Sequence, residues 1–442
     1  MARNPRALRR PKTFKTGVWY GRSQVGTLVK APDGRVTFAY APTWLQNADA
    51  FPVASSLPLS SETLHGPMVI SVFDNLLPDA EGELREKIAE RIGAAGVDPY
   101  SLLSVLGRDC VGALQFLPEN EQPAAQDMCY RAVSNAEMQA DLTGLAAAPL
   151  AIGTDKDFRI SIAGAQEKTA YLRLTSGWAK PRGITPTSHI FKTPMGILPG
   201  PEQIDLSDSV ENELFCMTLA HEIGLPVARV EKITLPEITA LAVERFDRIW
   251  DGDVLKRLPQ EDLCQSLGVA SSQKYQKSGG PSVADILNLL RESDDPRQDR
   301  ETFFKAQIFF YLIGASDGHA KNFSLRLGRQ GRFRLAPLYD IISLAPVVAM
   351  GRLQRKRYRL AMSIDGHYGI DELVPRHFVA EGAASGFSAD YVQALLRDMS
   401  AKLETAIERS INGLGSQVPR SVTDPIQTDA NTRARAVLAL LD

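Results

Sequence analysis

Two carboxylates and one carboxamide lie close together in the second half of the sequence, at a spacing that suits phosphoryl transfer. Asp317 and Asn322 occur in the stretch SDGHAKN, and Asp340 follows in LYDI. The D-x-x-x-x-N spacing equals that of a protein-kinase catalytic loop, where the aspartate accepts the proton of the substrate hydroxyl and the asparagine binds Mg²⁺. Mg²⁺ prefers oxygen ligands, so Asp340 is a candidate second ligand. An isolated Asp-Gly is more often a turn, but the three residues together favour a magnesium-dependent site.

A phosphate-binding site also needs a cation, and Lys192 is the candidate. It ends the strand-forming run HIFK, where an unpaired ammonium would be costly, so we expect a carboxylate partner from the helix that follows. Glu211 and Glu213 are both available. We favour Glu213 because it lies at helical spacing from the apolar Val210 and Met217. The alternative is a lysine on an edge strand whose ammonium reaches solvent.

Two further stretches are candidate nucleotide contacts. Residues 161–168 place small side chains between two predicted strands, which would let backbone N–H groups approach a phosphate. This stretch has one glycine, Gly164, where a kinase glycine-rich loop has three, so a plain hairpin turn is the alternative. Residues 244–246 end the last strand before the helical part, which is the position of a hinge that would bind the adenine edge.

The pattern of apolar residues predicts an α+β chain in which a β-rich part precedes a helical part. Within residues 17–118 we predict a small β-rich module with one helix, over 79–92, beginning at Asp79. A helix over 208–222 would begin with a capping box formed by Asp208 and Glu211. The predicted strands are 17–20, 24–29, 36–40, 158–162, 168–174, 189–192, 229–234 and 240–246, followed by a hairpin over 323–335 and by helices over 283–293, 299–313, 389–411 and 430–441.

Composition limits the classes of protein to which the chain can belong. It has 442 residues, and 50 Lys and Arg against 52 Asp and Glu give a net charge of −2. Near neutrality argues against a histone-like or polybasic nucleic-acid binder, although residues 3–15 are basic. The 4 cysteines are far apart and favour a reducing cytosol. No apolar run approaches the ~20 residues that span a bilayer, so we expect a cytoplasmic protein with no membrane partner.

Several stretches together resemble the HipA family, the kinase toxins of bacterial HipBA toxin–antitoxin modules. The resemblance covers nearly the whole chain from about Gly17. Its most specific stretches are FRISIAGAQEKT (158–169), AVERFDR (242–248), RLPQEDLC (257–264) and GASDGHAKNFS (314–324), with FDNLLPD (73–79) and LYDIIS (338–343) in addition. The sequence departs from the family in its basic start and in IDGHYGID (364–371), where a lysine-rich DNA-contacting segment would be expected.

The resemblance implies a bilobal protein-kinase-like fold with a β-rich N-terminal accessory subdomain and a mostly helical C-terminal lobe, and ATP and Mg²⁺ as ligands. Asp317 would be the catalytic aspartate, and autophosphorylation of Ser161 would inactivate the protein. Asn322 and Asp340 would bind Mg²⁺, and Lys192 the phosphates, with Glu213 as a possible partner of that lysine. The ATP-binding residues would be Ala163, Gly164, Ala165, Gln166, Glu167, Lys168, Lys192, Glu244, Arg245, Phe246, His319, Ala320, Lys321, Asn322, Tyr339 and Asp340.

With this resemblance we predict four segments: a basic and flexible tail over 1–16, the accessory subdomain over 17–118, a nucleotide-binding N-lobe over 119–256, and a helical C-lobe with the catalytic loop over 257–442. The basic run over 352–359 is by default a solvated face, with contact to a phosphate backbone as the alternative.

The resemblance also implies partners. These are a HipB-like antitoxin, operator DNA reached mainly through that antitoxin, and a target aminoacyl-tRNA synthetase such as glutamyl-tRNA synthetase, whose phosphorylation would halt translation and induce growth arrest and persistence. Bound to the antitoxin, the protein would act as a transcriptional corepressor. Two alternatives stay open: a DNA-bound corepressor scaffold that needs no catalysis, and a kinase of the same fold that acts on a small molecule.

Overall fold

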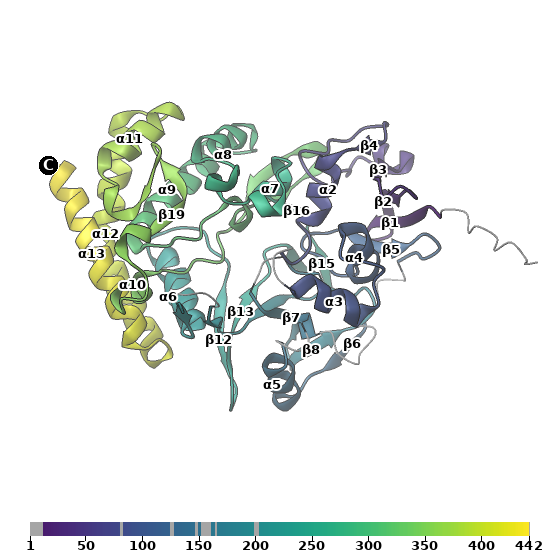
Figure 1. The fold of residues 1–442 in the computed structure, drawn as a ribbon, viewed down its shortest axis with the longest axis horizontal. Helices are drawn as coiled ribbons and strands as arrows, with labels where there is room; N and C mark the ends of the chain where they lie inside the picture. The colour runs from purple at the N-terminus through teal and green to yellow at the C-terminus, as the bar shows by residue number, and fades with distance from the viewer. Residues whose placement is uncertain are drawn as a thin grey trace, which may run out of the picture.

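The structure, a computed structural model, describes residues 12–79, 83–123, 128–145, 149–151, 161–163, 166–198 and 203–441. The chain runs along the long axis of the molecule, from an N-terminal sheet at one end, through a second sheet in the middle, to a group of helices at the other end (Figure 1). This order follows the predicted change from β-rich to helical sequence.

The N-terminal part is a five-stranded antiparallel sheet in the order β4-β3-β2-β1-β5, covered by short helices. The predicted strands near 17–20, 24–29 and 36–40 are confirmed, but the prediction of one helix is wrong, because the structure has four. Two of them, PMVISVFD and PYSLLSVL, are short and mostly apolar, and such short apolar runs cannot be assigned to helix or strand from their pattern alone. The elements are β1 (Phe14–Tyr20), β2 (Ser23–Lys30), β3 (Val36–Tyr40), α1 (Pro42–Leu45), β4 (Leu64–His65), α2 (Pro67–Asp74), α3 (Leu84–Ile92), α4 (Pro99–Leu106) and β5 (Gln115–Pro118).

Two elements of this part, the first strand and the predicted helix over 79–92, begin at other residues than predicted. Strand β1 already begins at Phe14, so Lys15 and Thr16 belong to the sheet rather than to a tail, and residues 1–11 lie outside the described residues. Helix α3 begins at Leu84, so Asp79 does not cap it. The carboxylate of Asp79 instead accepts a hydrogen bond from Lys274 at 2.6 Å, and this long-range ion pair replaces the local cap.

The middle part is a six-stranded antiparallel sheet in the order β12-β13-β9-β7-β8-β6. Strand β9 lies between β13 and β7, so the alternative of an edge-strand Lys192 is excluded. The predicted strand over 158–162 does not form at Ser161 and Ile162, and residues 158–160 lie outside the described residues. The elements are β6 (Tyr130–Ala132), α5 (Asn135–Thr143), β7 (Lys168–Leu174), β8 (Gly177–Pro181), β9 (His189–Lys192), β10 (Gly196–Ile197), β11 (Asp205–Leu206), α6 (Ser209–Glu222), β12 (Val230–Thr234), β13 (Thr239–Glu244), β14 (Arg248–Asp251) and β15 (Val254–Arg257).

Helix α6 confirms the helix predicted over 208–222, but its capping box is absent. Asp208 precedes the helix without a side-chain cap bond. Glu211, the other half of the predicted box, forms an ion pair with Lys232 on β12 at 2.5 Å. The carboxylate of Glu211 therefore links α6 to β12 and does not cap its own helix.

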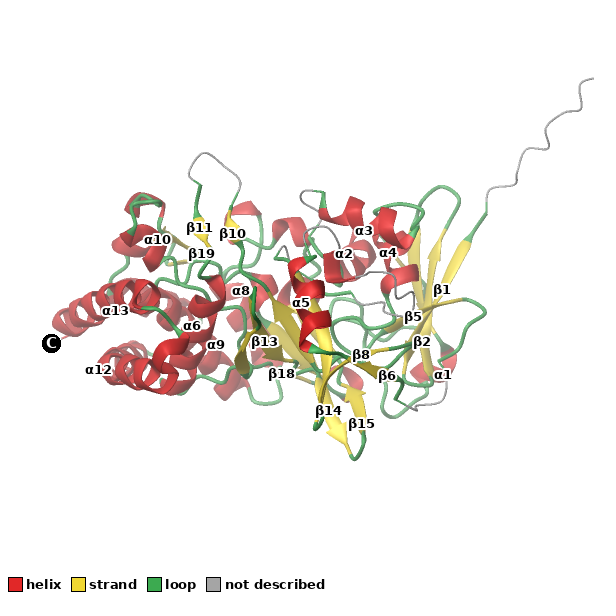
Figure 2. Cartoon of the chain, turned by 90° about the horizontal axis from the view of Figure 1, so that it is seen from below, coloured by secondary structure: helices red, strands yellow, loops and turns green. Residues whose placement is uncertain are grey.

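The C-terminal part is mostly helical, and its four predicted long helices are confirmed as α8 with the turn after it, α9, α12 and α13. The predicted hairpin over 323–335 is also confirmed, as β17 and β18, with β16 as a third strand. Helices α12 and α13 lie side by side at the end of the molecule (Figures 1 and 2). The elements are β16 (Gln260–Asp262), α7 (Leu263–Ser266), α8 (Val283–Leu289), α9 (Pro296–Ile313), β17 (Ser324–Leu327), β18 (Phe333–Leu335), α10 (Ala345–Ala349), β19 (Arg359–Ile364), β20 (His367–Gly369), α11 (Pro375–Ala384), α12 (Ala389–Leu414) and α13 (Arg420–Leu441).

Helix α9 is the centre of the C-terminal core, with Phe303, Phe304 and Phe309 fully buried. It ends at Gly314, which has a φ of 68°. A Cβ at this position would lie 1.4 Å from the hydroxyl oxygen of Tyr358, so only glycine fits. The sharp turn at Gly314 directs the next residues, including Asp317, away from the helix axis.

The helices of the described part of the chain differ from a membrane span in length or apolarity. None of its helices combines the length and the apolarity needed to cross a bilayer.

Candidate active site

A cavity of about 500 Å³ lies between the middle sheet and the C-terminal part. Most of the residues predicted from sequence to bind a nucleotide line it: Ala163, Gln166, Glu167, Lys168, Lys192, Glu244, Arg245, Phe246, Asp317, His319, Lys321, Asn322, Tyr339 and Asp340. Ala320 is buried next to it without lining it, and Gly164 and Ala165 lie outside the described residues. Residues that are far apart in sequence therefore meet in one hollow.

Asp317 and Asn322 are joined directly within one loop after α9. The amide nitrogen of Asn322 donates to the backbone oxygen of Asp317 at 2.8 Å. This bond leaves the amide oxygen of Asn322 available as a ligand. One carboxylate oxygen of Asp317, Oδ1, accepts a hydrogen bond from the hydroxyl of Tyr275 at 2.5 Å.

Asp340 lies in the loop after β18 with a φ of 60°, in the left-handed region that non-glycine residues seldom adopt. Its Oδ1 accepts a hydrogen bond from the ammonium of Lys192 at 2.6 Å, and Glu213 accepts a second bond from the same ammonium at 2.7 Å. The predicted choice of Glu213 over Glu211 thus agrees with the geometry. Burial opposes the charged form of Asp340, but Lys192 and Lys168 hold the pKa of its carboxyl at about 2.

The buried triad of Lys192, Glu213 and Asp340 is strongly polarised. Burial alone would lower the pKa of Lys192, but the two carboxylates raise it above its ordinary value. Burial raises the pKa of Glu213 to about 7, against the opposing effect of Lys192. Lys192 is therefore permanently charged in the cavity, and its ammonium is fixed by hydrogen bonds to Glu213 and Asp340.

A second lysine, Lys168, lies beside Lys192 on the neighbouring strand. In the register of β7 and β9, Lys168 lies directly opposite Lys192. Its ammonium donates to the backbone oxygen of Ala163 at 2.8 Å. Burial, together with the charge of Lys192, lowers the pKa of Lys168 to about 8. Two neighbouring lysines repel each other, so an anion between them would be stabilised by both.

Ser161 lies outside the cavity wall and is completely buried, at 0% exposure. Its hydroxyl donates to the backbone oxygen of Leu76, and its backbone N–H donates to the backbone oxygen of Asp109 at 2.9 Å. Both partners belong to the N-terminal part. The segment that leads into the predicted phosphate loop is thus attached to that part.

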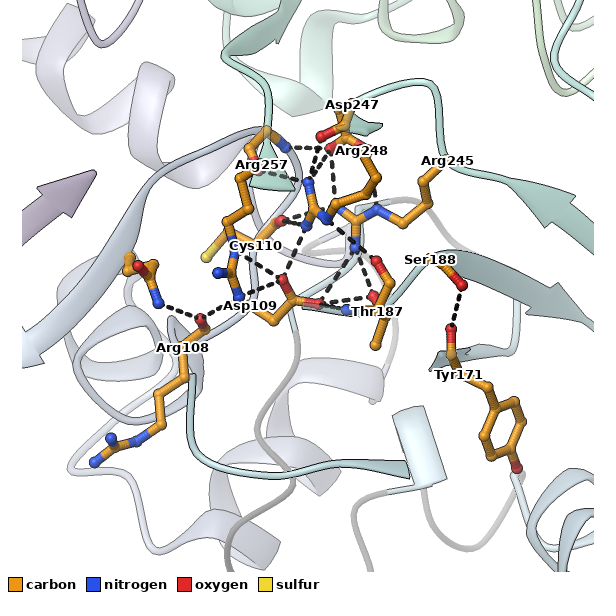
Figure 3. Close-up of polar contacts among 12 residues, drawn as sticks. Arg108, Asp109, Cys110, Tyr171, Thr187, Ser188, Arg245, Asp247, Arg248 and Arg257 are labelled. Atoms are coloured by element: carbon orange, nitrogen blue, oxygen red, sulfur yellow. Dashed lines mark hydrogen bonds and ion pairs between the residues drawn. The ribbon is translucent and has the colours of Figure 1, made fainter. Parts of the chain in front are cut away.

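At the other end of the cavity, Phe246 stacks on Tyr339 with ring centroids 5.6 Å apart. The hydroxyl of Tyr339 bonds to Ser324 and to the backbone oxygen of Lys321. Arg245 lines the cavity, but its guanidinium points into a buried ionic cluster with Asp109, Asp247, Arg248 and Arg257 (Figure 3). Its backbone alone is therefore available to a nucleotide.

The side chain of Lys321 is also engaged elsewhere. Its ammonium donates to the backbone oxygen of Asn75 at 2.7 Å, to the side-chain oxygen of Asn75 at 2.8 Å, and to Asp262 at 3.0 Å. In this structure the side chain of Lys321, a predicted ATP contact, instead links the loop that carries Asp317 to the N-terminal part.

Sequence reasoning missed four residues that support the site: Asn75, Asp109, Asp262 and Tyr275. Asn75 lies in FDNLLPD and Asp262 in RLPQEDLC, stretches that the family resemblance marked as specific without assigning them a role. For Asp109 and Tyr275 no local pattern gave a signal.

Another cluster of possible metal ligands, Asp365, His367 and His377, has ligand atoms within 4.8 Å of one another. The two imidazoles stack face to face, with centroids 3.9 Å apart and an interplanar angle of 10°. Imidazole lone pairs lie in the ring plane, so two nearly parallel planes cannot direct them to one ion. We therefore interpret this cluster as packing of the β19–β20 turn on α11.

Comparisons with known proteins agree with the geometry. The family model described as HipA N-terminal domain matches residues 16–117, and that described as HipA-like C-terminal domain matches residues 160–407. The protein Y4mE of Sinorhizobium fredii is 36% identical over 361 residues, which cover 79% of this chain and 83% of that protein. The serine/threonine-protein kinase toxin HipA of Shewanella oneidensis is 26% identical over 399 residues, which cover 85% of this chain and 84% of that protein.

Among solved structures, the chain is similar to one in the Shewanella oneidensis complex of HipA, HipB and operator DNA. The TM-score is 0.79 at 23% sequence identity, with 97% of this chain and 98% of that chain covered. This likeness confirms the predicted α+β fold, with a β-rich N-terminal part and a helical C-terminal lobe.

Proposed function

The chain belongs to the HipA family of kinase toxins, and from that premise we propose that its cavity binds ATP with Mg²⁺ and transfers the γ-phosphate to a serine hydroxyl of a protein. As a kinase of this family it uses ATP. The side-chain oxygens of Asn322 and Asp340, which line a cavity with two buried lysines, fit a hydrated Mg²⁺ bound to a nucleotide.

In this proposal each residue has one task. Asp317 accepts the proton of the serine hydroxyl while the serine oxygen bonds to the γ-phosphorus, and the bond from that phosphorus to the bridging oxygen breaks to release ADP. Asn322 and Asp340 would hold Mg²⁺, which when bound would neutralise charge on the phosphates. Lys192, fixed by Glu213, stabilises the phosphate oxygens, and Lys168 assists it.

The remaining predicted contacts are assigned around the nucleotide. Residues 163–168 cover the phosphates, the backbone of residues 244–246 binds the adenine edge, and the stacked pair of Phe246 and Tyr339 packs against the base from one side. His319, Ala320 and Lys321 shape the loop that carries Asp317. With these roles we also propose the segment boundaries at 118 and 256. The start of the accessory subdomain moves from residue 17 to Phe14, so that it includes the whole of β1.

One observation carries the proposal. Lys192, Asp317, Asn322 and Asp340 come from a strand, the loop after α9 and the loop after β18, and they line the same cavity. A scaffold that served only to bind DNA would not require a buried lysine held by two carboxylates, Glu213 and Asp340, in a cavity that also contains Asp317 and Asn322. The corepressor-only alternative is therefore disfavoured.

The test is phosphate transfer by the purified full chain. With labelled ATP and Mg²⁺, wild type should incorporate label, and Asp317→Asn and Asp340→Asn should not. Asp33→Asn, which changes an exposed aspartate in the turn between β2 and β3, should keep wild-type activity. Equal labelling by Asp317→Asn would refute the assignment of the base.

We further propose that autophosphorylation of Ser161 inactivates the protein. The phosphate would carry up to two negative charges into a completely buried site whose present partner is the backbone oxygen of Leu76. A phosphate dianion has no proton to donate to this carbonyl oxygen and is repelled by it, so the segment would have to leave its place on the N-terminal part and disturb the adjoining phosphate loop. Mapping the labelled peptide tests this site.

At the cellular level we propose a toxin held by a HipB-like antitoxin on operator DNA, as the composition of the similar Shewanella complex suggests. The target would be an aminoacyl-tRNA synthetase such as glutamyl-tRNA synthetase, and its phosphorylation would stop translation and induce growth arrest in the cytoplasm. In the basic run, Arg355 is already paired with Asp371 and Asp429, so DNA contact would come mainly from the antitoxin.

A further inference from the structure

The carboxylate of Asp317 is held by one residue outside its own loop. The hydroxyl of Tyr275 donates to its Oδ1 at 2.5 Å, and within the described part of the chain no other side chain donates a hydrogen bond to this carboxylate. The side chain of Asp317 is 56% exposed. Without the tyrosine, an aspartate so open to solvent would be free to change rotamer.

Tyr275 itself is fixed in place. Its ring meets the imidazole of His319 edge to face, with centroids 4.8 Å apart and planes at 85°. The backbone oxygen of Tyr275 accepts hydrogen bonds from Ser278 and Gly280. Burial, and the negative charge of Asp317, raise the pKa of the Tyr275 hydroxyl well above its ordinary value, so it remains protonated and can only donate to the carboxylate.

The segment that carries Tyr275, residues 271–278, is attached to three parts of the molecule. Ser271 donates to Asp74 and Lys274 to Asp79, both at 2.6 Å, which ties the segment to the N-terminal part. The backbone oxygen of Lys274 accepts a bond from Ala320 in the catalytic loop. On the far side, Gln276 bonds to Ser363 of β19. The tyrosine hydroxyl is thus preorganised before any substrate binds.

We propose that Tyr275 is a positioning residue for phosphoryl transfer: its hydroxyl holds Oδ1 of Asp317 so that Oδ2 faces the acceptor hydroxyl. The inference rests on the proposed role of Asp317 as base. It also gives the N-terminal part a share in catalysis, because that part anchors the segment that positions the base.

The test is Tyr275→Phe in the full chain, which keeps the ring against His319 and removes only the hydroxyl. The initial rate of label incorporation at saturating ATP and Mg²⁺ should fall about tenfold or more, as expected for loss of a hydrogen bond to a charged group that acts in the transition state. The dissociation constant for a non-hydrolysable ATP analogue with Mg²⁺, measured by calorimetry, should not change. The matched control is Tyr391→Phe, which removes a hydroxyl bonded to Glu301 between α12 and α9 and should leave both quantities unchanged.

Slower transfer together with unchanged analogue binding separates positioning from a general structural effect. The proposal is overturned if Tyr275→Phe transfers phosphate at the wild-type rate or faster, or if it weakens analogue binding as much as it slows transfer. If Asp317→Asn remains active, the assigned base is wrong and the proposal falls with it. An inactive Asp317→Asn beside a fully active Tyr275→Phe overturns the role of Tyr275 alone.

Discussion

Replacement of Asp109 by asparagine should cause a large loss of stability, because this aspartate joins the N-terminal part to the middle part of the chain. Its Oδ1 accepts bonds from Arg248 at 2.9 Å and from Arg257 at 2.9 Å, and its Oδ2 accepts from the hydroxyl of Thr187 at 2.7 Å. Its side chain is 4% exposed. Burial opposes its charge, but the arginines hold the pKa of Asp109 far below its ordinary value.

The magnitude follows from the charges that remain. Asp109→Asn leaves Asp247 as the one carboxylate in the cluster of Figure 3, beside the guanidiniums of Arg245, Arg248 and Arg257. Removal of one partner from a buried ionic network costs about 3–5 kcal/mol. A protein of ordinary stability has about 5–15 kcal/mol in total, so the variant should unfold at a clearly lower urea concentration.

The assay is urea unfolding followed by far-ultraviolet circular dichroism. The control is Asp251→Asn, which removes the same charge from an exposed pair with Lys256 and should change the unfolding free energy by less than about 1 kcal/mol. Equal shifts for Asp109→Asn and Asp251→Asn would refute the view that the buried cluster joins the two parts.

Three further predictions concern the end of α9, a buried acid and the lysine of the cavity. Gly314→Ala should lower the melting temperature by several degrees, because at a φ of 68° its Cβ would collide with Tyr358. Gly413→Ala, with open space around the added Cβ, should not lower it. Equal melting temperatures of the two variants in differential scanning calorimetry would contradict this prediction. Burial raises the pKa of Glu261 to about 7 while its ordinary value is 4.5, so its neutral form favours folding and stability should fall as the pH rises from 4.5 through 7. Glu261→Gln should flatten this fall in urea titrations at pH 5 and pH 8, and an unchanged slope would contradict the burial argument. Glu213→Gln should slow phosphate transfer about tenfold by loosening Lys192, whereas Glu211→Gln, whose partner is Lys232, should not; similar rates for both variants would remove Glu213 from the site.

The part of the site that the sequence predicted depends on short-range spacing. The interval between Asp317 and Asn322 lies within one loop, and Glu213 was chosen because it lies at helical spacing from the apolar Val210 and Met217. Helices α9 and α12 were visible from the periodicity of long segments. In each case neighbouring residues carry the information.

The contacts that the sequence did not predict join distant segments. Lys321 meets Asn75 and Arg248 meets Asp109 across sequence separations of 246 and 139 residues. Such pairs leave no periodic signal, because each partner is a single polar residue in a loop or at a strand end. The capping box at Asp208 failed for a related reason, since Glu211 gains more from Lys232 on a neighbouring strand than from its own helix end.

The central claim is that Asn322, Asp340 and Lys192 bind the phosphates of ATP with Mg²⁺ in front of Asp317. A crystal structure of the full chain with Mg²⁺ and a non-hydrolysable ATP analogue tests it most directly. We predict oxygens of Asn322 and Asp340 at about 2.0–2.1 Å from the ion, the ammonium of Lys192 on the phosphates, and Asp317 facing the γ-phosphate. An analogue bound outside this cavity, or an ion held by other residues, would contradict the account.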